Sequence, residues 1–552
     1  MQLPDELYIK LLTENDVLTD QQLKEAETFS KLQNISLHES LIQKDFVSDE
    51  NLGRLIADYL KLPFVLLSKV SIKDDILHIV PSEIVQREKV IAYGVKNHKL
   101  ELATSNPDNI HLFELIGQKV GAEIVLAYAT ERDINECLRL FKKDISATIA
   151  PLIGDGSLEK DTPVEKIVDH LIENGYEQKA SDVHIEPSEE FCLIRFRIDG
   201  VLSDVIKLPR NLHDQIVTRI KVASRLRTDE HFSAQDGKMQ IKLEAEELDI
   251  RVSIVPIVDG EKVVLRLLTS HFRQFGLTDL GMGDGDLAKV RNGFMKPYGM
   301  ILSTGPTGSG KTTSIYSILK ILNTRERNIA TIEDPVEYDI EGINQIQVNQ
   351  KTNLTFAEGL RSILRQDPDI IYVGEIRDEE TASIAINSAT TGHLVVSTLH
   401  TNDAATAFVR LIDMNVEPFL VSSTVNTIIG QRLVRKNCEM CKVSYTMTPE
   451  ELGTRISAAH ISTHFGKTKE VRMYKGKGCA VCHNTGYLGR IGIFEVLELS
   501  DEIQELVNRK ADSEEILKKA KELGMTTMLD DGLDKVQEGI TTLDEIMRAV
   551  QE

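Results

Sequence analysis

The sequence lacks tryptophan and has few aromatic residues of any kind, which make up 5% of its 552 residues. Basic charge is also scarce, because 64 Lys and Arg residues face 86 Asp and Glu residues and give a formal net charge of −22. Nucleic-acid binding usually needs a cationic groove and aromatic platforms for base stacking. The composition therefore argues against direct binding of nucleic acid and against a broad electrostatic contact with anionic lipid.

Long apolar runs are absent as well. No stretch approaches 18 consecutive apolar residues, and the start, MQLPDELYIKLLTEND, lacks the basic and apolar regions of a signal peptide. The sequence predicts a cytoplasmic protein. Its six cysteines are too sparse for a disulfide scaffold in a chain of this length.

With 41% apolar and 27% charged residues, the chain has the composition of a globular protein, and its length predicts several domains. Apolar periodicity and turn-forming segments give the predicted boundaries. These are an accessory region at 1–143, with a weak helical repeat at 1–60 and an α+β part at 61–143; a linker at 144–162; a small α+β domain at 163–270; an α/β core with a parallel sheet at 277–436; a cysteine-containing subdomain at 437–485; and a helical region at 486–552.

A phosphate-binding loop is the clearest motif. Residues 305–312 fit G-x-x-x-x-G-K-[ST], after the apolar run 300–303 and before the helical run TTSIYSILKIL. In such a loop, backbone N–H groups surround phosphates, Lys311 reaches the β- and γ-phosphates and Thr312 can bind Mg²⁺. The nucleotide is expected to contact Gly305, Pro306, Thr307, Gly308, Ser309, Gly310, Lys311, Thr312 and Thr313.

Hydrolysis also needs carboxylates, and two strand ends supply them. The apolar run 369–373 leads to Glu375, in the manner of a strand that delivers an acid to a bound metal. The run 328–332 leads to a cluster that contains Glu333 and Glu337. The alternative for this second cluster is a solvated acidic loop.

Two histidines bracket the apolar run 394–399. His393 precedes it and His400 follows it, each within a polar cluster. We expect them to take part in sensing the γ-phosphate. A role as ordinary core or surface histidines is the alternative.

Four of the cysteines form two C-x-x-C pairs, Cys438 with Cys441 and Cys479 with Cys482. This spacing is typical of a tetrahedral structural zinc site, which leaves no open coordination position for catalysis. The sequence thus predicts a Zn²⁺ ion that clamps a subdomain, with reduced free thiols as the alternative.

Taken together, the motifs resemble those of the secretion ATPases of type II secretion systems and type IV pilus assembly. The resemblance rests on GPTGSGKTT, TIEDPVEY, LRQDPDIIYVGEIRDEETA and TGHLVVSTLHTNDA in the family's order, and upstream on ASDVHIEP, RFRIDGVL and GEKVVLRLL. It implies a RecA-like motor core preceded by a PAS-like α+β domain. It also implies a homo-hexamer that uses ATP and Mg²⁺, and the cysteine insertion is similar to that of assembly-type members.

The resemblance also implies residue roles. Glu375 is similar to the family's Walker B acid, and Glu337 to its favoured general base, with Glu333 as the alternative. Cations that neutralise the γ-phosphate come from the preceding domain in this family, and Arg251 and Arg266 stand at matching places. Exposed arginines in solvent ion pairs are the alternative for these two.

The implied function is a cytoplasmic motor, peripheral to the inner membrane, that drives assembly of a type IV pilus or a type II secretion pseudopilus through an inner-membrane platform protein. The N-terminal repeat only partly resembles the helical domains of some members, so we favour a protein-docking module there over a site for a signalling nucleotide. A nucleic-acid translocase and a catalytically inactive scaffold are the competing classes.

Overall fold

The computed structural model describes residues 5–15, 17–33, 35–70, 72–138, 141, 145–153, 163–243, 247–268, 276–479 and 481–551. The chain divides into two compact units. The first comprises Met1–Ile72, Tyr93–Arg132 and Gln274–Glu552, and the second comprises Lys73–Ala92 and Asp133–Arg273.

The centre of the first unit is a seven-stranded sheet in the order β12-β11-β13-β14-β10-β15-β18. Its first six strands pair in parallel and β18 pairs antiparallel with β15. The predicted central strands are confirmed, and β12, β15 and β18 were not predicted. The strands are β10 (Gly299–Thr304), β11 (Ile329–Glu333), β12 (Ile343–Gln347), β13 (Ile370–Val373), β14 (Leu394–Leu399), β15 (Val425–Asn437) and β18 (Tyr487–Glu498).

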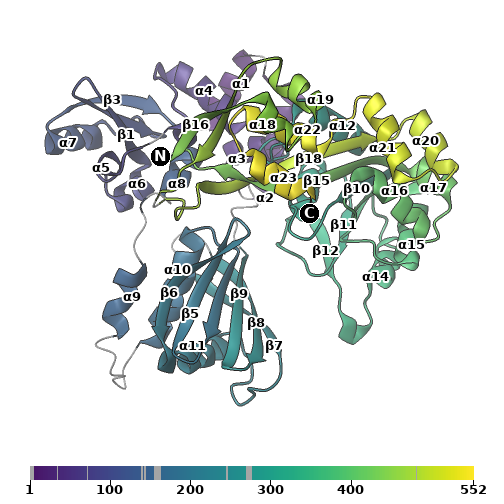
Figure 1. The fold of residues 1–552 in the computed structure, drawn as a ribbon, viewed down its shortest axis with the longest axis horizontal. Helices are drawn as coiled ribbons and strands as arrows, with labels where there is room; N and C mark the ends of the chain where they lie inside the picture. Colours follow the sequence, from purple (N-terminus) through teal and green to yellow (C-terminus); the bar gives the residue numbers. More distant parts are fainter. Residues whose placement is uncertain are drawn as a thin grey trace. The chain divides into compact units, whose positions relative to one another are not determined.

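Helices cover both faces of this sheet (Figure 1). Met300 and Leu302 of β10 belong to one buried cluster and Ile301 to the other, as the alternation of side chains along a strand requires. A parallel sheet covered on both faces confirms the predicted α/β core. The first of these clusters includes residues of α14 (Phe356–Ile363), α15 (Glu379–Thr390), α16 (Ala404–Asp413) and α17 (Pro418–Thr424), and the second includes residues of α12 (Asp284–Met295) and α13 (Lys311–Leu322).

The cysteine-containing lobe lies between the two longest strands of the sheet. β15 leads into the hairpin of β16 (Lys442–Met447) and β17 (Val471–Gly476), and β18 returns the chain to the sheet. The region 486–552 is therefore not helical throughout, because its first strand completes the motor sheet. Its remainder is helical as predicted, with α20 (Asp501–Asn508), α21 (Ser513–Glu522), α22 (Met528–Gln537) and α23 (Leu543–Gln551).

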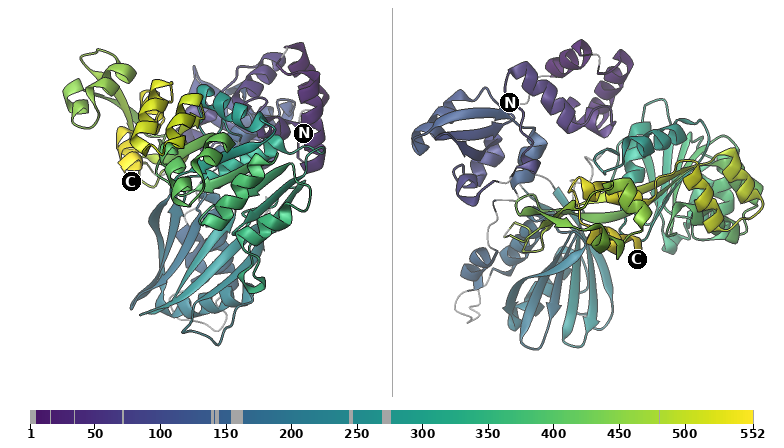
Figure 2. Two further views of the ribbon diagram at one scale, coloured as in Figure 1. Left: turned by 90° about the vertical axis from the view of Figure 1, so that its right-hand side faces the viewer. Right: turned by 45° about the horizontal axis from the view of Figure 1, so that its top comes forward.

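The second unit contains a six-stranded antiparallel sheet in the order β6-β5-β4-β9-β8-β7, drawn in blue to teal in Figures 1 and 2. One face packs on α10 (Val164–Glu177) and α11 (Arg210–Ala223). Alternate residues of β5, β8 and β9 are buried there, which explains the period-two pattern of the sequence. The strands are β4 (Asp182–Pro187), β5 (Phe191–Ile198), β6 (Val201–Pro209), β7 (Gln235–Lys242), β8 (Glu247–Ile257) and β9 (Gly260–Leu268).

The predicted linker at 144–162 contains a helix, α9 (Ile145–Ile153), whose Ile149 is buried in the core of the second unit. Residues 144 and 154–162 of that prediction lie outside the described residues.

The N-terminal region begins with four helices, as the repeat predicts: α1 (Asp5–Glu14), α2 (Asp20–Gln33), α3 (Leu37–Gln43) and α4 (Asp49–Leu60). A small sheet of β1 (Val90–Lys96), β2 (Lys99–Thr104) and β3 (Glu123–Tyr128) follows, with α7 (Ile110–Val120) between its last two strands. Phe64 forms a single parallel bridge with Tyr128 of β3. Within the described part of the chain, no helix combines the length and apolarity needed to cross a bilayer.

Candidate nucleotide site

The predicted phosphate loop connects β10 to α13, as its motif requires. Gly305, Gly308 and Gly310 have φ angles of +148°, +81° and +90°, which side chains other than glycine rarely adopt. A Cβ on Gly305 would lie 2.6 Å from the backbone oxygen of Gln431. Gly310 is the N-cap of α13 and has no side-chain capping bond, so the first-turn N–H groups are left for an anion.

Lys311 lies inside this loop and is 8% exposed. Its Nζ donates hydrogen bonds to the backbone oxygens of Gly305 (2.7 Å) and Pro306 (3.0 Å). Burial lowers the pKa of Lys311 to about 8, although Glu375 opposes this shift. An anion beside the ammonium group would stabilise its charged form, which is what a phosphate supplies. The loop, the uncapped helix and this lysine therefore fit a nucleoside triphosphate.

A buried glutamine on a neighbouring strand supports the loop. Gln431 of β15 donates from Nε2 to the backbone oxygen of Ser309 (2.8 Å) and accepts from Ser303 Oγ (3.2 Å). Sequence reasoning missed Gln431. Only the pairing of β15 with β10, which no local pattern reveals, brings it to the loop.

Glu375 follows β13 at the same edge of the sheet, as predicted. Its Oε2 lies 2.7 Å from Arg377 Nε and 3.3 Å from His400 Nε2, and its side chain is 12% exposed. Burial and the charge of Lys311 lower the pKa of His400, which favours a neutral ring. The structure thus places Glu375 and His400 together.

His393 lies at the opposite end of β14. Its Nδ1 faces the backbone oxygen of Ser388 at 2.9 Å, and its own carbonyl accepts from Gly299 at the start of β10. The phosphate loop follows the other end of β10. Because residues that bracket a strand lie at opposite sheet edges, the structure does not bring His393 to the site, and its position does not support the predicted sensing role.

The two candidate bases of the acidic cluster differ in their surroundings. Glu333 is 3% exposed, and its carboxylate accepts hydrogen bonds from Tyr316 Oη (2.5 Å), Thr331 Oγ1 (2.5 Å) and Gln345 Nε2 (3.2 Å). Burial raises the pKa of Glu333 despite these bonds. Glu337 is half-buried. The carboxylate of Glu333 is thus enclosed in a hydrogen-bonded network, and the residue is more deeply buried than Glu337.

The four predicted metal ligands converge. Their sulfur atoms all lie within 4.8 Å of one another, with separations of 3.9 Å for Cys438–Cys479, 3.8 Å for Cys441–Cys482 and 3.7 Å for Cys479–Cys482. A tetrahedral zinc ion with Zn–S bonds of about 2.3 Å places sulfurs about 3.8 Å apart. The residues therefore fit zinc.

Hydrogen bonds and proton affinity support the same conclusion. Burial, followed by the neighbouring thiols, raises the pKa of Cys438, which shows that a thiolate is unfavourable there without a compensating charge. Four thiolates this close together therefore need a cation. Backbone N–H groups of Cys479 and Gly486 donate to the Cys482 sulfur at 3.2 Å, and that of Gly478 donates to Cys441 at 3.3 Å. Such donors orient metal-bound thiolates.

Arg251 and Arg266 belong to the second unit, where they face each other across β8 and β9. Arg266 Nε lies 3.1 Å from Asp182 Oδ1, and the arginine side chain is 61% exposed. Both stand on the sheet face opposite α10 and α11, because their strand neighbours are buried in the core. Their part in ATP hydrolysis stays a prediction.

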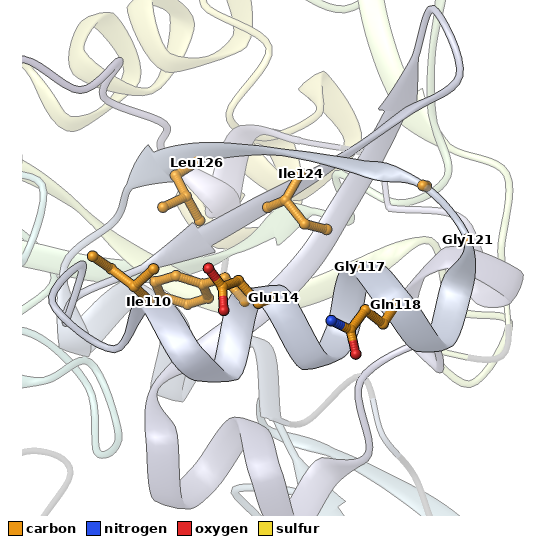
Figure 3. Close-up of a pocket in the computed structure, with 9 residues that line it drawn as sticks. Ile110, Glu114, Gly117, Gln118, Gly121, Ile124 and Leu126 are labelled. Atoms are coloured by element: carbon orange, nitrogen blue, oxygen red, sulfur yellow. The ribbon is translucent and has the colours of Figure 1, made fainter.

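A groove of about 630 Å³ lies between α7 and β3 in the N-terminal region (Figure 3). Its lining is mainly apolar, with Glu114 and Gln118 as the polar side chains. A lining of this kind, with a carboxylate and no cation, does not suit a phosphate group.

Comparison with known proteins agrees with this geometry. The family described as "Type II/IV secretion system protein" matches residues 157–548, and the MshEN domain matches residues 60–147. The chain is 36% identical over 557 residues to the type IV pilus assembly ATPase PilB of Myxococcus xanthus, with 98% of each chain covered. It is 44% identical over 452 residues to the type II secretion system ATPase E of Vibrio cholerae, with 80% of this chain and 88% of the relative covered.

Among solved structures, the ATPase DotB of Legionella pneumophila is similar in fold, with a TM-score of 0.51 and 21% identity. The match covers 69% of this chain and 94% of that one.

Proposed function

Because the chain belongs to the Type II/IV secretion system protein family and is a P-loop ATPase, we propose that it powers assembly of a type IV pilus or a type II secretion pseudopilus. In this proposal a homo-hexamer acts on an inner-membrane platform protein. The observation that carries it is the joint presence, at one sheet edge, of the phosphate loop, Lys311, Glu375 and His400, in a chain that matches a pilus assembly ATPase over 98% of its length.

The family implies ATP and Mg²⁺ as the nucleotide and its metal. We assign the phosphates to the residues of the loop and Lys311, and Mg²⁺ to Thr312. When bound, Mg²⁺ would neutralise phosphate charge. Glu375 would supply the carboxylate on the Mg²⁺ side of the nucleotide. His400 Nε2 lies 3.3 Å from that carboxylate.

Glu337 is proposed as the general base because the carboxylate of Glu333, the alternative, is enclosed by hydrogen bonds from Tyr316, Thr331 and Gln345. A base must lie within reach of a water molecule, and Glu333 would have to break bonds to Tyr316 and Thr331 first. Arg251 and Arg266 are proposed to supply cations from the second unit. In this proposal the domain that carries these arginines moves as ATP is bound and hydrolysed, which would convert hydrolysis into mechanical work.

The tetracysteine lobe is proposed to hold zinc as a structural clamp. β15 carries Gln431 at the phosphate loop and ends next to Cys438, so one strand joins the two sites. A closed site of four thiolates would fix the far ends of β15 and β18 and would not take part in the reaction.

The test is to measure ATP hydrolysis and oligomeric state of the purified full chain, with and without the cytoplasmic part of the platform protein. We expect a hexamer on nucleotide binding and stimulation by the platform protein. Lys311→Ala should abolish hydrolysis, whereas Lys296→Ala, an exposed lysine of the same core, should leave it unchanged. A monomer whose hydrolysis rises with DNA and not with the platform protein would contradict the proposal.

A further inference from the structure

A row of charged side chains crosses the open face of the six-stranded sheet. Strand register aligns its members directly opposite one another on five neighbouring strands. From β7 to β5 these are Lys238, Arg251, Arg266, Asp182 and Arg197. Like charges opposite one another destabilise a sheet, and here three cations are adjacent. An arrangement of this cost suits an anionic ligand better than a structural role.

Asp182 is the one carboxylate in this row. Its Oδ1 lies 3.1 Å from Arg266 Nε and its Oδ2 lies 3.6 Å from Arg197 Nε, while Ser181 Oγ donates to Oδ2 at 2.8 Å. The Asp182 side chain is 7% exposed, in contrast to 61% for Arg266. The carboxylate is therefore fixed and the guanidinium that it holds faces solvent.

The form of the contact leaves Arg266 able to bind an anion. A guanidinium carries five N–H donors, and the bond to Asp182 uses the one on Nε. The donors on the two terminal nitrogens are not used by this bond, and they match the geometry of a phosphate. A flexible arginine would have to lose side-chain entropy when it binds.

A second carboxylate on the same strand provides an internal comparison. Glu186 also joins β5 and β9, through Arg195 Nη2 (2.7 Å) and Lys262 Nζ (2.8 Å). It lies on the same sheet face as Asp182, four residues along β4, and its ion pairs are with Arg195 and Lys262. Both carboxylates should stabilise the sheet, and Asp182 is the one that pairs with Arg266.

We propose that Asp182 is a positioning residue for Arg266: it fixes the guanidinium that, in the proposed function, meets the γ-phosphate of ATP. This inference rests on the proposed function, in which Arg266 serves the nucleotide site. Asp182 contributes orientation, which matters most in the transition state. Its negative charge also weakens the attraction between the row and ATP, so its loss should not weaken ATP binding.

The experiment is to measure kcat, KM for ATP and melting temperature of full-length Asp182→Asn, Glu186→Gln and Arg266→Ala. We expect Asp182→Asn to lower kcat about tenfold with KM unchanged or lower. Glu186→Gln should lower the melting temperature by a similar amount and keep kcat and KM within about twofold of the wild type. Arg266→Ala should lower kcat at least about 100-fold.

The outcomes separate the positioning role of Asp182 from the proposed role of Arg266. If Asp182→Asn has the kcat of Glu186→Gln while Arg266→Ala is inactive, the positioning role is wrong and the proposed function stands. If Arg266→Ala is fully active, the proposed role of Arg266 fails. Should Asp182→Asn not fold, Asp182→Glu moves the carboxylate by one methylene group: we expect a lower kcat at an unchanged melting temperature, and a wild-type kcat overturns the inference.

Discussion

The phosphate loop lies beside the middle of β15 and the tetracysteine lobe follows the C-terminal end of the same strand, and the two sites are built in opposite ways. At the loop, the first turn of α13 is uncapped and Glu375 faces His400 at the sheet edge. At the lobe, four sulfurs enclose a space the size of one zinc ion, and backbone N–H groups already bond to two of them. One site is open to a substrate, and the other is enclosed by four thiols whose spacing fits a zinc ion.

This difference predicts whether substitutions at each site change the reaction rate or the stability of the fold. Substitutions in an open site remove interactions made with the substrate, so they lower the reaction rate. Substitutions in a closed site remove interactions made within the fold, so they lower stability. Four experiments test this division.

Zinc removal should have the largest effect. Structural zinc contributes about 10 kcal/mol or more of binding free energy in small zinc domains, so a chelator or Cys438→Ser should unfold the lobe. Metal analysis should find one zinc per chain, and calorimetry should show loss of a transition when it is removed. Cys192→Ser, a buried cysteine of the second unit, should retain the metal. Unchanged melting without zinc would contradict the closed-site description.

Loss of the open site's carboxylates should come next. Glu375→Gln and Glu337→Gln keep the size of each side chain and remove its charge, and each should lower kcat by about 100-fold or more, with little change in melting temperature. Steady-state ATP hydrolysis measures the effect. Glu341→Gln, an exposed acid of the same segment, is the control. If Glu337→Gln hydrolyses ATP at the wild-type rate, Glu337 is not the general base.

The sequence predicts these two sites well because each depends on a local pattern. The loop glycines, Lys311 and the C-x-x-C pairs are recognisable within a few residues, and the apolar runs identify the central strands. Gln431 and Asp182 are different, because their partners lie on strands that are distant in the sequence. Likewise, β18 belongs to the motor sheet only through its long pairing with β15. His393 is the opposite case. Its closeness to His400 in the sequence suggests that both histidines lie at the nucleotide site, but they stand at opposite ends of β14 and are kept apart by that strand.

Glu333 breaks the simple comparison, because it lies near the open site and is itself enclosed. Glu333→Gln should lower the free energy of unfolding by about 1–3 kcal/mol, since a buried carboxylate loses part of its bonding to Tyr316 and Thr331. Chemical denaturation measures this loss. We expect kcat to fall much less than in Glu337→Gln. Equal loss of kcat at unchanged stability would instead make Glu333 the base.

The smallest effect is a pH dependence of the closed lobe. His464 is 7% exposed and bonds through Nδ1 to Asp534 (2.6 Å) and through Nε2 to Asp530 (3.0 Å), and His460 Nε2 also lies 3.5 Å from Asp530. Burial lowers the pKa of His464, but the two aspartates outweigh it and raise the pKa above 6.5.

A group with a raised pKa in the folded state stabilises the protein fully below the unfolded value, and the contribution is lost as pH rises through the folded value. Wild-type stability should therefore fall by about 1 kcal/mol from pH 6 to pH 8.5 relative to His464→Asn. Denaturation at both pH values measures the difference, with His111→Asn, an exposed histidine of α7, as the control. Parallel pH profiles for wild type and His464→Asn would show that the aspartates do not hold a charged ring. That result would leave zinc as the main source of the lobe's stability.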